Sequence, residues 1–194
     1  MTLGGGMLLM LGTPGRPVLN GVTIRPLAAA PTASSLEGVF TTRVPIDAGR
    51  WQAIVIHHTG TSYATPESLD QAHRERNLAS LGYHFVIGNG SGLGDGEVHI
   101  GGRWLDQQPG AHTGGPNGVW YDQNAIGICL VGDGDRRPFT RAQLDRLVRL
   151  TTLIGRQAGL GPDRVVLHNQ VAETTSPGWN FPAASFAEQL REVW

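Results

Sequence analysis

From Trp51 onward, short apolar runs alternate with polar or glycine-rich segments. The runs predicted to be strands are, in chain order, QAIVIH (52–57), YHFVIG (83–88), EVHIGG (97–102), AIGICLVG (125–132) and RVVLH (164–168). AIGICLVG is continuous in its apolarity, which is typical of a strand that is covered on both faces, so we expect residues 125–131 at the centre of the sheet. The glycine-rich segment GNGSGLGDG separates YHFVIG from EVHIGG and predicts a β-hairpin.

Helical spacing and capping residues predict the helices 66–79, 140–158 and 182–194. Thr65 can cap the first of these, with Pro66 at its first position. Thr140 and Gln143 have the spacing of a capping box at the start of the second helix. Strands that alternate with helices indicate an α/β fold. We therefore predict a single domain in which helices pack on both faces of a mixed β-sheet.

Residues 1–45 are rich in Gly, Pro, Ala, Ser and Thr, so we interpret them as an N-terminal tail or linker before a domain of residues 46–194. A chain of 194 residues fits one domain of ordinary size. MLLML is too short to span a membrane, and no Lys or Arg precedes it as in a secretory signal. PLAAAPTAS nevertheless offers small residues for a cleavage site, so secretion or association with the cell envelope is one alternative. A cytoplasmic location and a phage-encoded protein are the others.

The charge is nearly balanced, with 15 basic and 16 acidic residues, and every basic residue is Arg. No polybasic segment is present, which argues against nucleic acid as a partner. Cys129 is the only cysteine and lies within AIGICLV, so we expect a buried small hydrophobic side chain. We expect the protein to be a monomer.

Polar side chains gather where the predicted strands begin or end. His57 and His58 follow the apolar residues IVI, Tyr83 and His84 open YHFVIG, His112 lies in PGAHT, and His168 follows VVL. Open α/β sheets collect their functional sites at strand ends. Since His57 and His58 point to opposite faces of one strand, only one of them can share a site with His168.

Five sequence pieces, IVIHHTGT, GYHFVIGNG, GAHT, NAIGICLVGD and H-x7-SPG, occur in an order that resembles the type 2 N-acetylmuramoyl-L-alanine amidases. That family includes phage lysozyme-type amidases and peptidoglycan recognition proteins, and the resemblance covers about residues 50–182. It implies an amidase-like α/β domain. Peptidoglycan or a muropeptide is the implied partner.

The resemblance also implies a zinc site. In the family, the first His of HHT, the His that closes a late strand, and a Cys or Asp eight residues later hold the ion, so the matching residues here are His57, His168 and Ser176. A serine hydroxyl is neutral near pH 7 and a poor zinc donor, so Ser176 is a degenerate third ligand. Glu173 or Asp163 could supply a carboxylate instead. The mid-strand burial of Cys129 argues that its thiol faces away from the site.

The other family positions are occupied by suitable side chains. Tyr83 matches a tyrosine that hydrogen-bonds the reacting water or the oxyanion, and Thr174 stands where an oxyanion donor is expected. His112 matches a histidine that lines the zinc cavity. We assign His112 to both catalysis and substrate binding, and Asn124 to substrate binding. His84 and His58 would face away from the metal and make packing and local hydrogen-bond contacts.

The resemblance implies zinc-dependent hydrolysis of the amide between the lactyl group of N-acetylmuramic acid and L-alanine. Because Ser176 departs from the family pattern, a peptidoglycan-binding module without catalysis is an alternative. A scaffold that uses only the fold, and a serine hydrolase built on Ser176 and His168, are further alternatives.

Overall fold

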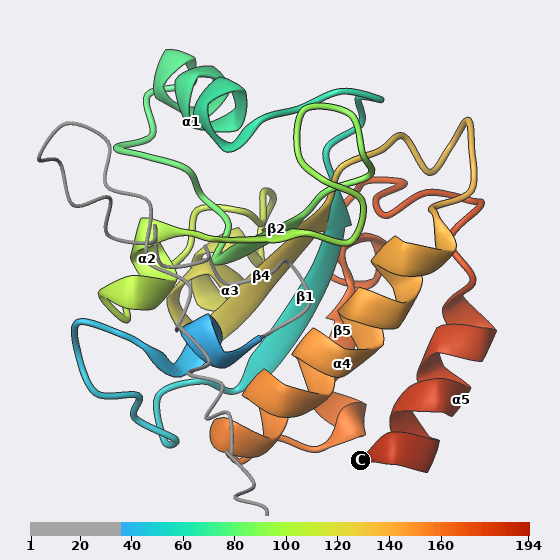
Figure 1. The fold of residues 1–194 in the computed structure, drawn as a ribbon. Coiled ribbons are helices and arrows are strands. Elements are labelled where there is room, and N and C mark those ends of the chain that lie inside the picture. Colours follow the sequence, from blue (N-terminus) through green and yellow to red (C-terminus); the bar gives the residue numbers. More distant parts are fainter. Residues whose placement is uncertain (1–35) are drawn as a thin grey trace, which may run out of the picture. The chain divides into compact units, whose positions relative to one another are not determined.

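The apolar run AIGICL forms the central strand of a five-stranded sheet with the order β3-β2-β4-β1-β5 (Figure 1). The computed structural model describes residues 36–194. The central strand pairs in parallel with β1 and β2, β5 pairs in parallel with β1, and β3 is antiparallel to β2. The strands are β1 (Ala53–His58), β2 (Phe85–Ile87), β3 (Val98–Ile100), β4 (Ala125–Leu130) and β5 (Val165–Leu167). The predicted mixed sheet and its central strand are confirmed.

Helices connect these strands. They are α1 (Pro66–Glu75), α2 (Gly102–Leu105), α3 (Gly118–Asn124), α4 (Arg141–Gln157) and α5 (Ala183–Val193), with 3-10 helices η1 (Glu37–Phe40), η2 (Pro162–Arg164) and η3 (His168–Gln170). Thr65 caps α1, and Thr140 forms a capping box with Gln143 on α4, as predicted. The first helix ends at Glu75 rather than at residue 79, because Asn77 adopts a φ of 64° and breaks the helical path. None of the helices in the described part is long and apolar enough to cross a membrane.

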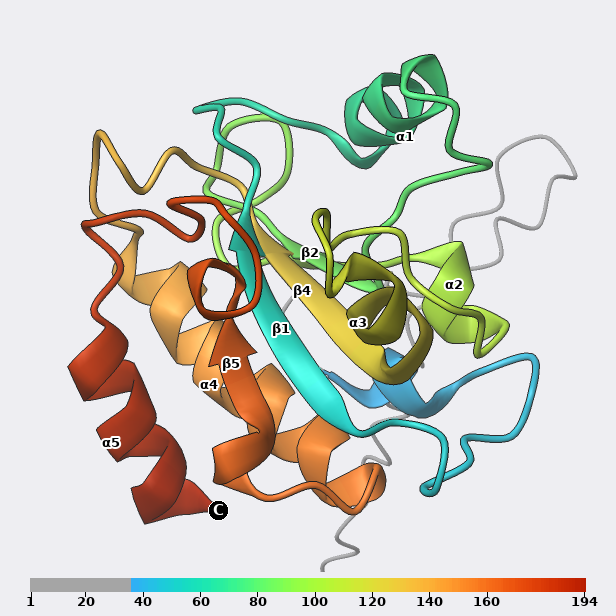
Figure 2. The ribbon, with the colours of Figure 1, turned by 180° about the vertical axis from the view of Figure 1, so that it is seen from behind.

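The two faces of the sheet carry different side chains. Figures 1 and 2 show α4 and α5 over one face and α3 over the other. Alternation along β1 and β4 sends Ile54, Ile56 and Ile128 into the large apolar core beside α4. His57 and its register partner Cys129 therefore point to the α3 face. Helices on both faces confirm the predicted architecture, and the candidate site lies on the α3 face.

The predicted tail of residues 1–45 lies mostly outside the described residues. Within the described part, residues 36–45 include η1, whose Val39 is buried in the apolar core. The indole of Trp104 donates a hydrogen bond to the carbonyl of Val39 at 2.7 Å. Arg43 forms a bidentate ion pair with Asp106, with N–O distances of 2.6 and 2.7 Å. Residues 39 and 43 are therefore attached to the domain through its α2 region.

Thr151 in α4 is fully buried, and its hydroxyl has no hydrogen-bond partner among the described residues. Thr151→Val keeps the shape and removes the unpaired polar atom, so we expect the free energy of unfolding to rise by about 1 kcal/mol. Urea denaturation measures this change. A loss of stability would mean that the hydroxyl has a partner in solution.

Candidate functional site

Three imidazole rings, those of His57, His112 and His168, lie together on the α3 face; we call them the imidazole cluster. The His57 ring centroid is 4.3 Å from that of His168 and 4.9 Å from that of His112. β1 and β5 are parallel neighbours with Ile56 opposite Leu167, so the next residue of each chain segment, His57 and His168, is brought to the same level. The Tyr83 ring lies 5.3 Å from that of His57.

Hydrogen bonds determine which nitrogen of the His112 ring carries the hydrogen and, through His112, which nitrogen of the His57 ring does. Nε2 of His112 lies 3.3 Å from the carbonyl oxygen of Ala125, and a carbonyl can only accept, so this nitrogen carries the proton. Nδ1 of His112 is then an acceptor, 3.1 Å from Nε2 of His57 and 2.9 Å from the Thr113 hydroxyl. His57 therefore donates through Nε2, which leaves the lone pair on its Nδ1.

Two nitrogens of the cluster are buried without a partner among the described residues: Nδ1 of His57 and Nε2 of His168. Burial is the main cause that lowers the pKa of each of the three histidines. The pKa is about 4 for His112 and for His168, and that of His57 lies well below its usual range. The rings are therefore neutral near pH 7. Neutral imidazole with a free lone pair is the form that binds a metal ion.

Gly127 makes room for the His112 ring in the middle of β4. A Cβ atom at this position would lie 2.4 Å from Cδ2 of His112, closer than side-chain atoms can approach. Sequence reasoning missed this role, although a glycine inside a continuous apolar strand is a signal of close approach.

We expect Gly127→Ala to displace the His112 ring and break its hydrogen bond to His57. The overpacked site is expected to lose about 2 kcal/mol of unfolding free energy. Gly114→Ala is the matched control, because a Cβ atom there meets nothing within 4 Å. Denaturation curves of the two variants test this contact, and equal stability would contradict it.

Asp122 of α3 positions the loop that carries His112. Its Oδ1 accepts hydrogen bonds from the backbone N–H groups of His112 and Thr113, both at 2.8 Å. Sequence reasoning also missed Asp122, because only the fold brings α3 back onto this loop.

Ser176 lies in the loop between η3 and α5 and is 4% exposed. Its Oγ accepts a hydrogen bond from the backbone N–H of His58 at 3.1 Å, which brings Ser176 beside the end of β1. Nδ1 of His58 in turn accepts from the N–H of Gly134 at 3.0 Å. Neither His57 nor His168 has a hydrogen bond to the Ser176 hydroxyl within the described part of the chain. The structure therefore gives no support to a serine nucleophile activated by a histidine.

The model of the N-acetylmuramoyl-L-alanine amidase family matches residues 47–179. The chain belongs to this family. It is 31% identical over 139 residues to the endolysin of Escherichia phage T7, covering 66% of this chain and 81% of the endolysin. It is 30% identical over 134 residues to human peptidoglycan recognition protein 3, covering 64% of this chain but only 36% of that protein.

Solved structures agree with this assignment. The N-acetylmuramoyl-L-alanine amidase LysC from Clostridium intestinale superposes with a TM-score of 0.64 at 27% identity, covering 78% of this chain and 93% of LysC. The amidase fold is thus shared over most of the described domain.

In this member of the amidase family, Tyr83 and Thr174 are the predicted oxyanion donors. Burial, followed by the nearby Cys129 thiol, raises the pKa of Tyr83 well above its usual range, so the phenol stays protonated. The Thr174 hydroxyl accepts from the N–H of Ser176 at 3.2 Å, which leaves its own hydrogen available to donate. Both side chains can therefore donate a hydrogen bond.

The structure does not bring every predicted residue into contact with the cluster. The Asn124 amide donates to the carbonyl of Trp120 in the same helix at 2.8 Å, so its substrate-binding role stays a prediction. His84 bonds through both ring nitrogens to the backbone, at Gly127 and Gln108, as expected of a packing residue.

The expected orientation of Cys129 is corrected. Its register partner on the neighbouring strand is His57, so strand alternation sends both side chains to the same face. Burial raises the pKa of its thiol far above the usual range, which keeps it from being a thiolate.

Among residues 36–194, no group of three His, Cys, Asp or Glu side chains is arranged to hold a metal ion.

Proposed function

We propose that the protein hydrolyses the amide bond between the lactyl group of N-acetylmuramic acid and L-alanine in peptidoglycan, with a zinc ion held by His57 and His168. One observation carries this proposal: in this member of the amidase family, two adjacent neutral imidazoles each have a buried nitrogen without a hydrogen-bond partner among residues 36–194. Buried polar atoms without a partner are costly, so such a pair is typical of a ligand site.

The donor set fits zinc in part. Imidazole nitrogen is a preferred zinc donor, whereas the Ser176 hydroxyl is neutral and already accepts a hydrogen bond from His58. We infer that two imidazoles provide most of the affinity, with Ser176 as a weak third ligand. When bound, zinc supplies a Lewis acid that polarises the carbonyl and acidifies a water molecule.

The protein's own residues orient and stabilise the reacting groups. His112 accepts a hydrogen bond from Nε2 of His57 through its Nδ1, so Nδ1 of His57 is the nitrogen that would hold a zinc ion. An outer partner of this kind typically contributes about 10–100-fold to metal affinity or activity. The Tyr83 phenol and the Thr174 hydroxyl are proposed to donate hydrogen bonds to the oxyanion that forms on the amide carbonyl.

A peptidoglycan-binding module without catalysis is the second candidate function. It is favoured by Ser176, because a site with two strong ligands binds zinc less tightly than one with three.

The two candidates differ in zinc content and in product release. The purified full-length chain would be analysed for bound zinc and then incubated with peptidoglycan while released stem peptides are measured. An amidase releases stem peptides, and a chelator stops the release. Sedimentation with peptidoglycan but no release would favour the binding module, and neither binding nor release would contradict both candidates.

A further inference from the structure

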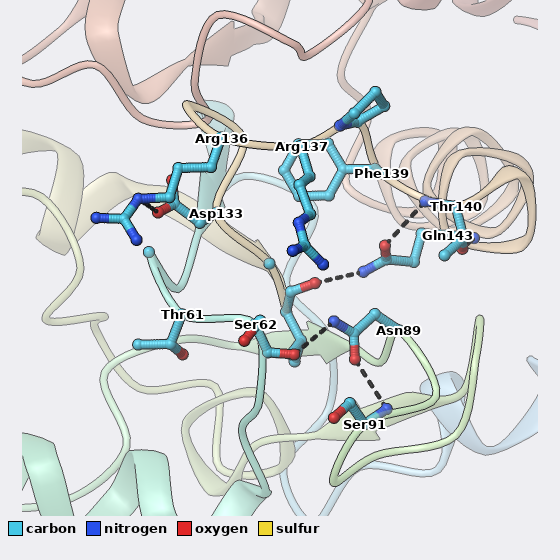
Figure 3. Close-up of a pocket in the computed structure, with 14 residues that line it drawn as sticks. Thr61, Ser62, Asn89, Ser91, Asp133, Arg136, Arg137, Phe139, Thr140 and Gln143 are labelled. Carbon is cyan, nitrogen blue, oxygen red and sulfur yellow. Dashed lines mark hydrogen bonds and ion pairs between the residues drawn. The ribbon is translucent and has the colours of Figure 1, made fainter.

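A second polar site shares no lining residue with the imidazole cluster. A cavity of about 650 Å³ is lined mainly by loops that follow three parallel strands, together with Gln143 of α4 (Figure 3). The lining loop residues are 60–62 after β1, 89 and 91 after β2, and 131–133 and 136–140 after β4. The carboxyl ends of parallel strands are the usual place for ligands in open α/β sheets. The volume is in the range of small-molecule and peptide-end sites.

Two arginines on the loop after β4 differ in their partners. Arg136 forms an ion pair with Asp133, with an N–O distance of 3.2 Å. Arg137 extends toward the middle of the cavity in Figure 3, and no side chain among the described residues pairs with its guanidinium group. Arg137 therefore offers a planar set of N–H donors whose geometry matches a carboxylate.

The walls of the cavity are held in place by their own hydrogen bonds. Asn89 donates to the carbonyl of Ser62 at 3.0 Å and accepts from the N–H of Ser91 at 2.9 Å. Gln143 is fully buried and donates to the carbonyls of Ile87 and Val131, at the ends of β2 and β4. A site with fixed walls loses little conformational entropy when a ligand binds.

The same loop that carries Arg137 also holds the segment around Ser176. Asp135 accepts hydrogen bonds from the Thr175 hydroxyl at 2.5 Å and from the N–H of Trp179 at 3.2 Å. The carbonyl of Gly134 accepts from the N–H of Asn180 at 2.8 Å. Hydrogen bonds from this loop thus connect the wall of the cavity to the segment that contains the proposed third ligand position.

We propose that this cavity binds a free carboxylate of the peptide stem of a peptidoglycan fragment, with Arg137 as the recognising residue. The inference rests on the proposed function and names a specificity subsite for it. The Asp133 carboxylate, which pairs with Arg136, favours a peptide end over a phosphate. It can accept a hydrogen bond from a peptide N–H group, and it repels a doubly charged phosphate more strongly than a singly charged carboxylate. The hydroxyls of Ser62 and Ser91 add neutral donors along the walls.

The test compares two N-acetylmuramoyl-peptide fragments that differ only in the last stem group, a free carboxylate or its amide. Binding is measured by calorimetry on full-length protein carrying His57→Ala, which we expect to prevent cleavage. We expect the carboxylate fragment to bind about tenfold more tightly than the amide, and Arg137→Ala to abolish this difference. Arg191→Ala, on α5, is the matched control and should keep the difference.

The outcomes separate this inference from the proposed function. Equal binding of both fragments by protein with Arg137, or an unchanged preference in Arg137→Ala, would overturn the carboxylate site and leave the amidase proposal standing. If neither fragment binds, and the chain with His57 intact releases no stem peptide, the proposed function fails and the inference fails with it. Circular dichroism of each variant checks that Arg137→Ala is folded, as expected for an exposed side chain.

Discussion

Ser176→Cys is expected to bind zinc roughly a hundredfold more tightly than the natural chain and to release stem peptides faster. A thiolate is a much better zinc donor than an alcohol, and it adds a negative charge that two neutral imidazoles lack. The backbone N–H of His58, 3.1 Å from the present Oγ, can also donate to the thiolate and stabilise it. Zinc affinity from competition with a chelator, together with the rate of peptide release, measures both effects.

Ser176→Ala separates ligand chemistry from packing in this experiment. It leaves the N–H of His58 without its side-chain acceptor, so we expect a loss of about 1 kcal/mol in stability and little change in zinc affinity. If the natural chain already holds one zinc per molecule tightly and gains nothing from cysteine, then another residue completes the site. The assignment of Ser176 would then be wrong.

Most of the fold could be predicted because its signals are local. The continuous apolarity of residues 125–131 predicted the central strand, and the capping residues Thr65 and Thr140 predicted the starts of two helices. The end of the first helix was wrong by several residues, because it depends on the left-handed backbone of Asn77 and on a tertiary contact. That contact is a hydrogen bond of 2.7 Å from the N–H of Leu81 to Asp70.

For the candidate site, the sequence predicted which residues take part, but not how they are hydrogen-bonded or oriented. His57 and His168 both lie at strand ends, and for that reason we predicted a shared site for them. The parallel register of β1 and β5 explains why the two residues lie together. The hydrogen-bond chain from Ala125 through His112 to His57 depends on a loop that folds onto Gly127, and no local pattern encodes it. The orientation of Cys129 was missed because burial was considered without strand alternation.

The loop after β4 shows a different limit of sequence reasoning. Neighbouring residues Arg136 and Arg137 look equivalent in the sequence, yet Asp133 pairs with only the first of them. Which guanidinium is available to a ligand is set by the turn geometry of the loop after β4. A basic pair in a loop therefore predicts charge, but it does not predict which residue recognises a ligand.

His57→Ala is expected to lose zinc entirely and to lower peptide release by about a thousandfold or more. The change removes the Nδ1 lone pair and the Nε2–H donor to His112, so only one of the two proposed imidazole ligands remains. His99→Ala is the matched control: His99 lies on the antiparallel strand β3, outside the imidazole cluster, and should keep zinc and activity.

Elemental analysis of the purified variants gives the zinc content, and thermal denaturation shows whether His57→Ala is still folded. We expect a folded protein that has lost about 2–3 kcal/mol of stability, because a fully buried ring is replaced by a partly collapsed cavity. A folded His57→Ala variant that retains one zinc per chain would contradict the ligand assignment. Retained activity without zinc would contradict the metal-dependent mechanism itself, because the remaining neutral imidazoles and the Tyr83 phenol provide no comparable Lewis acid.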